Sequence, residues 1–169
     1  NAFAEVVVIA GSLVFNLPLP LTAAQILWIN LVNDSWPTFA LAIDPKDGKR
    51  QVKRELFDRQ TKFSVALVSL LTGLIALTLF YVYRSQSLAF TLIAVAPLMY
   101  SFSIGSLKNF WLIGAAVVGL SFQFLVLYLP ALQTVFKTTG LGLSQWLLVI
   151  GGSLLIVATM ELVKRYDRR

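Results

Sequence analysis

Six apolar stretches, separated by turn-forming or charged residues, dominate this sequence. They cover residues 2–17, 23–43, 63–83, 88–107, 110–129 and 144–163. A helix needs about 20 mostly apolar residues to cross the hydrocarbon core of a bilayer. The chain is 57% hydrophobic and only 13% charged, with a mean hydropathy of +0.78, whereas soluble domains carry about 25% charged residues. Because helices satisfy their own backbone hydrogen bonds in lipid, the sequence predicts an all-α membrane protein, a six-transmembrane-helix bundle forming a single domain over residues 1–169.

The positive charges gather on one expected side of the membrane. The chain has 14 Lys and Arg residues and a net charge of +6. If the six helices alternate in direction, only Arg84 and Lys137 fall on one side, and all the other positive charges fall on the opposite side with the loop 44–62 and the C-terminus. The positive-inside rule places that richer side in the cytoplasm of a multi-pass protein, for which we expect the cell membrane. The charge therefore indicates topology and contact with the lipid bilayer, and not nucleic-acid binding.

The basic loop 44–62 is the only sizeable polar segment. It is either a docking surface for a cytosolic domain or a loop held against anionic lipid headgroups. The chain contains no cysteine and no histidine, which excludes disulfides, thiolate metal sites and imidazole chemistry. It begins at Asn1 within an apolar stretch and lacks the basic region of a signal peptide. We therefore expect the chain to be a segment of a longer protein.

An unusual group of polar residues interrupts the second apolar stretch. Asn30, Asn33 and Asp34 are spaced i, i+3, i+4, so they share one face of a helix. Pro37 lacks the N–H that would bond the carbonyl of Asn33. Carboxylate, amide and carbonyl oxygens together suit a hard cation such as Ca²⁺. A structural hydrogen bond to a neighbouring helix is the alternative role for Asp34, and interhelical hydrogen bonding is the alternative for the two asparagines.

Glu5 is the other acidic residue within an apolar stretch that could join this site. It lies about 18 Å along a helix from Leu17, and Asp34 lies about 21 Å along the next helix from Pro20, at 1.5 Å per residue. Because the first two helices are joined by a short turn, the two acids are expected at similar depth and facing each other. The alternative is that Glu5 reaches the cytosolic headgroups. No residue is predicted to be catalytic, and the expected metal ligands are Glu5, Asn30, Asn33 and Asp34.

The stretch PLPLTAAQILWINLVNDSWPTFALAIDPKD resembles the fifth-to-sixth-helix signature of the P-type cation-transporting ATPases, nearest the calcium pumps, whose usual form is close to LTxxQxLWxNLVTDxxPAxALGxEPP. The segment SLAFTLIAVAPLMYSF resembles the eighth helix of that family, and LVLYLPALQTVFKTTGLGLSQWLLV resembles the connection between its ninth and tenth helices. The resemblance covers essentially the whole chain. It implies the C-terminal transmembrane domain, helices five to ten, of an ATP-driven cation pump.

The resemblance also implies roles for individual residues. Asn30 and Asp34 match the sixth-helix cation ligands, Glu5 matches the fifth-helix acid, and Asn33 replaces the usual threonine ligand. The acid that two-calcium pumps carry in the eighth helix falls at Pro97, which implies one transported Ca²⁺ per cycle. Glu5 then serves as a ligand or as a carrier of counter-transported protons.

Other parts of such a pump do not occur in this sequence. The phosphorylated DKTG motif, the nucleotide-binding domain, the actuator TGE loop and the fourth helix are absent, so this polypeptide alone does not hydrolyse ATP. The resemblance implies that Mg-ATP acts only in the intact protein. It also implies that the partners of this chain are the cytosolic phosphorylation domain, which meets loop 44–62, and the N-terminal transmembrane helices. Two alternatives are a stand-alone six-helix protein that regulates or scaffolds a pump, and a small secondary cation transporter.

Overall fold

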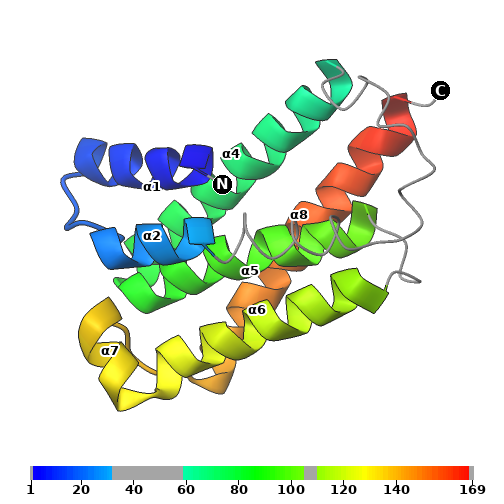
Figure 1. Cartoon of the computed structure of the whole chain (residues 1–169). Helices are drawn as coiled ribbons and strands as arrows, with labels where there is room; N and C mark the ends of the chain where they lie inside the picture. The colour runs from blue at the N-terminus through cyan, green and yellow to red at the C-terminus, as the bar shows by residue number, and fades with distance from the viewer. Residues whose placement is uncertain (1, 32–58, 105–109, 168–169) are drawn as a thin grey trace.

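The computed structural model describes residues 2–31, 59–104 and 110–167, which form helices joined by short connections (Figure 1). The helices are α1 (Ala2–Val14), α2 (Ala23–Asn30), α4 (Arg59–Tyr83), α5 (Gln86–Ile104), α6 (Phe110–Tyr128), α7 (Pro130–Phe136) and α8 (Leu143–Asp167). No strand occurs in these ranges, which confirms the all-α class.

The turn between α1 and α2 is closed by hydrogen bonds at both helix ends. Asn16 adopts a left-handed conformation with φ of 52°, and the N–H of Leu17 donates to the carbonyl of Ser12 at 2.8 Å, as in a Schellman motif. Thr22 then begins α2 with a capping box. Its hydroxyl accepts from the N–H of Gln25 at 3.3 Å, and the Gln25 side chain accepts from the N–H of Thr22 at 3.0 Å. The two helices therefore leave a defined turn in opposite directions (Figure 1).

The segment from Pro130 to Gly142, which the sequence analysis treated as a break between helices, contains the short helix α7. Pro130 occupies the start of α7, where its missing N–H costs nothing. Lys137 ends the helix in a left-handed conformation with φ of 52°, and its N–H donates to the carbonyl of Gln133. The axes of α6 and α7 meet at 87°. Helix α7 thus lies across the end of α6 (Figure 1).

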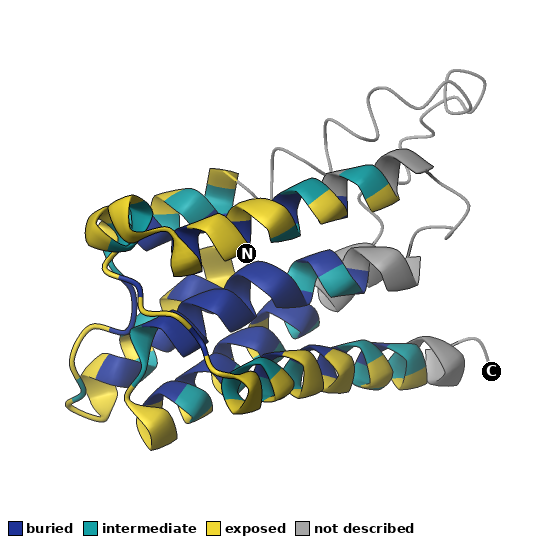
Figure 2. Cartoon of the chain, turned by 90° about the horizontal axis from the view of Figure 1, so that it is seen from below, coloured by how far each residue is buried: buried dark blue, intermediate teal, exposed yellow. Residues whose placement is uncertain are grey.

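Helix α5 is the centre of the structure. It contacts α2, α4, α6 and α8, and every residue from 87 to 96 is buried. Figure 2 shows this buried helix among neighbours whose outer faces are exposed. Helix α1 packs on α4, on the side of the bundle away from α6. The core is therefore a set of helix–helix contacts around α5, with α1 and α2 at one side.

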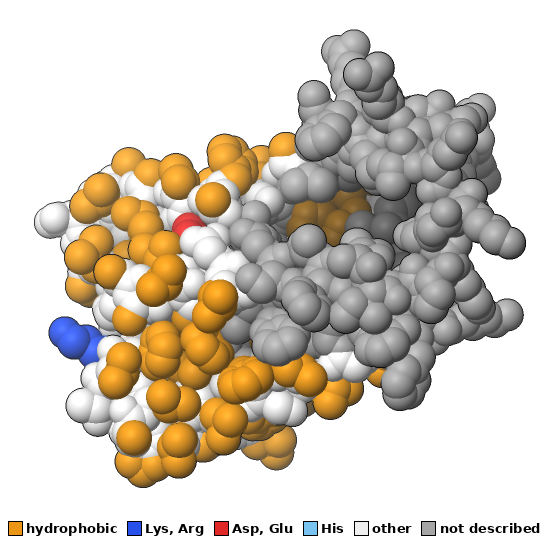
Figure 3. Space-filling model, in the orientation of Figure 1, with side chains coloured by type: hydrophobic (Ala, Val, Ile, Leu, Met, Phe, Trp, Pro, Cys, Tyr) orange, Lys and Arg blue, Asp and Glu red, His pale blue; other side chains and the backbone are white. Residues whose placement is uncertain are grey.

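The polar and apolar side chains are distributed as expected for a protein in lipid. Large apolar side chains are exposed on α1, α4, α6 and α8, and on the visible face of the described residues hydrophobic side chains far outnumber charged ones (Figure 3). The buried residues include several polar ones: Glu5, Ser12, Gln25, Ser69, Thr72, Ser87, Thr91, Gln123, Thr138 and Ser153. A surface this apolar is rare on soluble monomers, and buried polar side chains commonly join helices within membranes.

The structure supports the six expected membrane spans only in part. Within the described residues, Ala66–Tyr83 and Leu143–Val163 are long and apolar enough to cross a membrane, and the bent pair α6–α7 is a third span if counted as one. Helix α1 and the apolar part of α5, Gln86–Tyr100, are shorter. Residues 32–43 of the second expected helix lie outside the described residues, as does most of loop 44–62.

Three connections meet at one end of the bundle. The Gln86 side chain donates to the carbonyl of Leu19 in the α1–α2 turn at 2.6 Å, and the N–H of Thr139 donates to the Ser87 hydroxyl at 2.7 Å. These bonds join the start of α5 to the α1–α2 turn and to the loop after α7. Successive long helices run in opposite directions, which brings these connections to the same end (Figure 1).

Candidate cation site

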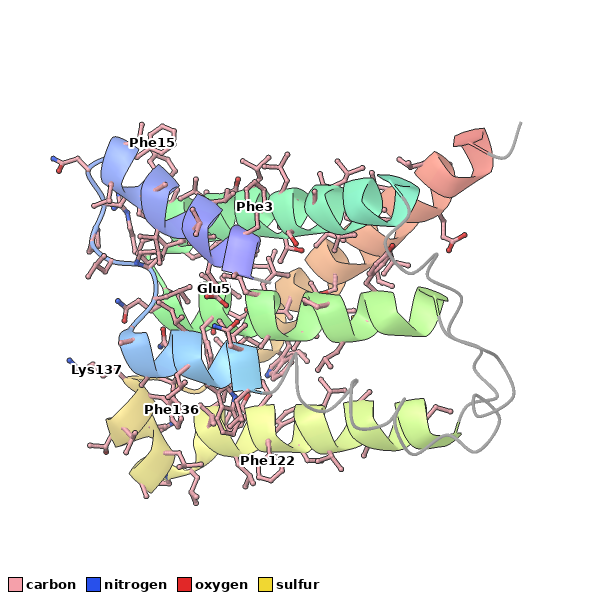
Figure 4. The ribbon with its side chains drawn as sticks, turned by 45° about the horizontal axis from the view of Figure 1, so that its top comes forward. Phe3, Glu5, Phe15, Phe122, Phe136 and Lys137 are labelled. Atoms are coloured by element: carbon pink, nitrogen blue, oxygen red, sulfur yellow. The ribbon has the colours of Figure 1, made fainter. Side chains whose placement is uncertain are left out.

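Glu5 lies on the inner face of α1. Together with Ala4, Val8 and Ser12 it forms the buried stripe of that helix, and only 5% of its surface is exposed. The spacing of these residues is that of one helix face. Figure 4 shows Glu5 on the side of α1 toward α2. The carboxylate therefore lies among the helices, and its depth relative to the lipid headgroups stays a prediction.

Asn30 is the last residue of α2, and its side chain meets Glu5. The amide nitrogen of Asn30 donates to Glu5 Oε2 at 3.5 Å and to the carbonyl of Ile26 at 3.0 Å. The first bond joins α1 to α2, and the second holds the amide against its own helix. A carboxylate and an amide from different helices thus meet within the bundle.

The other two expected ligands, Asn33 and Asp34, lie outside the described residues, as does Pro37. Asp34 follows Asn30 by four residues, which is about one turn or 6 Å along a helix. The contact between Glu5 and Asn30 shows that the first two helices bring polar side chains together, although the depth argument paired Glu5 with Asp34. It leaves the expected ligand set itself a prediction.

The described residues offer few acidic ligands. Within residues 2–31, 59–104 and 110–167, no three Asp, Glu, His or Cys side chains lie together. Ca²⁺ takes six to eight oxygens at about 2.3–2.6 Å, from carboxylates, amides and backbone carbonyls. Glu5 and Asn30 supply only part of such a set, so further oxygens have to come from other residues.

A second polar contact on α2 was not found by sequence reasoning. The Trp28 indole N–H donates to Gln123 Oε1 on α6 at 3.2 Å. The two residues are 95 positions apart. The sequence does not indicate this contact, because an isolated glutamine in an apolar stretch does not show which helix it meets.

The sequence model of the family described as "Cation transporting ATPase, C-terminus" matches residues 18–166 of this chain. The chain belongs to this family. Over 88% of its length it is 32% identical to a calcium-transporting ATPase of Bacillus subtilis, and over 93% it is 31% identical to the human calcium-transporting ATPase type 2C member 2. A calcium-transporting ATPase of Bacillus cereus is 25% identical over 96% of the chain. These matches confirm the resemblance to the C-terminal region of cation-transporting ATPases.

The chain matches only part of each of these relatives. It covers 19% of the Bacillus subtilis protein, 19% of the human protein and 23% of the Bacillus cereus protein. The chain thus spans about a fifth of their length. Of the expected ligands in this ATPase region, the structure brings together Glu5 and Asn30.

Proposed function

We propose that the chain is the C-terminal membrane part of an ATP-driven calcium pump and that it contributes ligands to the transport site. The contact between buried Glu5 on α1 and Asn30 on α2 carries this proposal. A carboxylate within lipid costs roughly 2.5–3.5 kcal/mol or more, so such residues usually bind or carry ions. The family and the names of its relatives support calcium as the ion.

The two described residues have complementary roles in this proposal. The Glu5 carboxylate supplies negative charge, and the Asn30 amide supplies a neutral oxygen. In the arrangement described, the Asn30 amide donates its N–H to the carboxylate. Rotation of the amide by about 180° would direct its oxygen toward a cation at the same place. Asn33 and Asp34 complete the proposed ligand set. Release of the ion requires a second state of the pump with lower affinity for it.

The membrane topology is part of the proposal. Six transmembrane helices, with loop 44–62 and the C-terminus in the cytoplasm of the cell, account for the distribution of positive charge. The chain would then act with the N-terminal helices and the cytosolic phosphorylation domain of the same pump, which binds Mg-ATP. The match to a C-terminal ATPase model favours this over a stand-alone regulator or a secondary transporter.

ATP-driven uptake of radioactive calcium into vesicles containing the complete protein tests the proposed function. We expect uptake to require ATP and to persist when proton and sodium gradients are collapsed. Uptake driven by either gradient without ATP would instead indicate a secondary transporter. Competition by Mn²⁺ and Na⁺ in the same assay identifies the ion that the site prefers.

The proposed stoichiometry is a single ion, because Pro97 occupies the place where the resemblance puts a second-site acid. Helix α5 continues on both sides of Pro97, so a residue with an N–H fits its backbone. We expect Pro97→Glu to retain calcium transport and to add a second, weaker binding step. Calcium titration of phosphorylation checks this through its steepness. A folded but inactive variant would show that Pro97 itself is required.

A further inference from the structure

Helix α2 carries the candidate ligand on one side and a set of anchoring contacts on the other. Successive residues of an α-helix are rotated by about 100°, so Trp28 and Asn30 project about 160° apart around the axis of α2. Asn30 meets Glu5 on α1, whereas Trp28 meets Gln123 on α6. The rotation of α2 about its axis therefore determines both contacts together.

The anchoring contacts form a directed chain of hydrogen bonds. The Trp28 indole can only donate, so Gln123 has to present its oxygen to it, at 3.2 Å. The amide nitrogen of Gln123 then faces the Thr91 hydroxyl at 3.4 Å, and that hydroxyl donates to the carbonyl of Ser87 at 2.7 Å. Gln123 and Thr91 are almost completely buried, at 1% and 0% exposed. The side chain of Gln123 therefore has one orientation that satisfies both of its partners.

The indole of Trp28 is also held by aromatic rings from α6 and α7. The Phe136 ring lies edge-on to it at 5.2 Å between centroids, and the Phe122 ring at 6.1 Å. Figure 4 shows Phe136 on α7, next to α2, and Phe122 on α6. The Gln25 side chain, one turn before Trp28, donates to the carbonyl of Phe136 at 2.9 Å. These contacts hold the first turns of α2 against α6 and α7.

We propose that Gln123 is a positioning residue for the cation site, because its bond to Trp28 sets the rotation of α2 and so directs Asn30 toward Glu5. This inference rests on the proposed function. Side-chain atoms lie about 5–6 Å from a helix axis, so a rotation of about 10° moves them by about 1 Å. A displacement of this size is large for a cation whose ligands lie at about 2.3–2.6 Å.

Three variants of the complete protein test the role of Gln123. Gln123→Leu removes both of its hydrogen bonds, Trp28→Phe removes only the indole donor, and the double variant combines the two. Gln133→Leu is the matched control. It also loses a glutamine hydrogen bond, from Gln133 to the carbonyl of Leu127 at 2.5 Å, but this bond lies within the α6–α7 corner and does not involve α2.

The measurement is the free calcium concentration that gives half-maximal phosphorylation by ATP, together with the maximal level of phosphorylation. Interhelical hydrogen bonds in membranes are worth about 0.6–1.7 kcal/mol, which converts to a roughly 3- to 18-fold increase in that concentration. We expect this increase for Gln123→Leu and Trp28→Phe, with an unchanged maximum. We expect the double variant to resemble the more affected single variant, and Gln133→Leu to resemble the wild type.

A purely structural role for Gln123 gives a different pattern. The maximal level of phosphorylation would then fall for Gln123→Leu while the half-maximal calcium concentration stays constant, and this result would overturn the inference. Additive effects of Gln123→Leu and Trp28→Phe would also overturn it, because residues acting through one bond are not additive. If Gln123→Leu does not fold, the half-maximal calcium concentration of Trp28→Phe alone decides whether the inference holds. Failure of the proposed function is distinguishable, because Glu5→Gln would then also leave calcium dependence unchanged.

Discussion

Replacing Glu5 by Gln is expected to abolish calcium-dependent phosphorylation of the pump at micromolar calcium. The substitution keeps the size of the side chain and its capacity to accept a hydrogen bond from Asn30, which lies at 3.5 Å from Oε2. It removes the negative charge of a residue that is only 5% exposed. Because the affinity of a Ca²⁺ site depends on the charge of its ligands, we expect the half-maximal calcium concentration to rise by roughly 100-fold or more.

Two further variants separate the charge of Glu5 from its shape and position. Glu5→Asp retains the charge on a shorter side chain and is expected to have an intermediate affinity. Glu161→Gln removes an acid from α8, outside the contact between α1 and α2, and is expected to leave calcium affinity unchanged. Equal loss of affinity in Glu5→Gln and Glu161→Gln would point to a general effect of charge on the membrane domain.

Replacing Gly73 by Val is expected to destabilise the packing of α1 on α4 and to lower calcium affinity with it. A Cβ atom at Gly73 would lie 2.8 Å from Val7 Cβ and 3.0 Å from the backbone oxygen of Ala4. The backbone of α1 cannot move aside as a flexible side chain can, so the two helices have to separate. Overpacking of this kind costs about 1–3 kcal/mol. Because Ala4 directly precedes Glu5, the separation also displaces the carboxylate.

Two other glycines provide the comparison for Gly73→Val. A Cβ atom at Gly114 in α6 meets no atom within 4 Å, so Gly114→Val is expected to be nearly neutral. The three atoms nearest to a Cβ atom at Gly11 all belong to the Leu77 side chain, whose end can move, so Gly11→Ala is expected to cost less than Gly73→Val. Thermal unfolding of the purified protein in detergent measures the three effects. A Gly73→Val variant as stable as Gly114→Val would contradict the packing described for α1 and α4.

The sequence was informative about the helices and less so about their ends. Long apolar stretches predicted helical segments because a chain in lipid has to satisfy its own backbone groups. The short helix α7 was missed, since segment 130–142, with one proline, three threonines and two glycines, was taken as a connection. Pro130 at the start of that segment was the available signal, because proline favours the first turn of a helix.

The candidate site shows a similar limit. Counting residues from the turn between the first two helices predicted that Glu5 and Asp34 lie at similar depth. Asp34 lies outside the described residues, and Glu5 is in contact with Asn30, another of the expected ligands. The bond between Trp28 and Gln123 could not be predicted in this way, because no short turn relates α2 to α6. Apolar helix surfaces carry little information about which neighbouring helix they contact. The packing of the helices around α5 determines which helices are neighbours.

Equilibrium binding of radioactive calcium to the complete protein, purified in detergent and without ATP, tests the cation site most directly. We expect the wild-type protein to show a single class of saturable calcium sites, and we expect this binding to be lost in Glu5→Gln but retained in Glu161→Gln. Calcium binding of unchanged amount and affinity in Glu5→Gln would contradict the assignment of the transport site to the contact between α1 and α2.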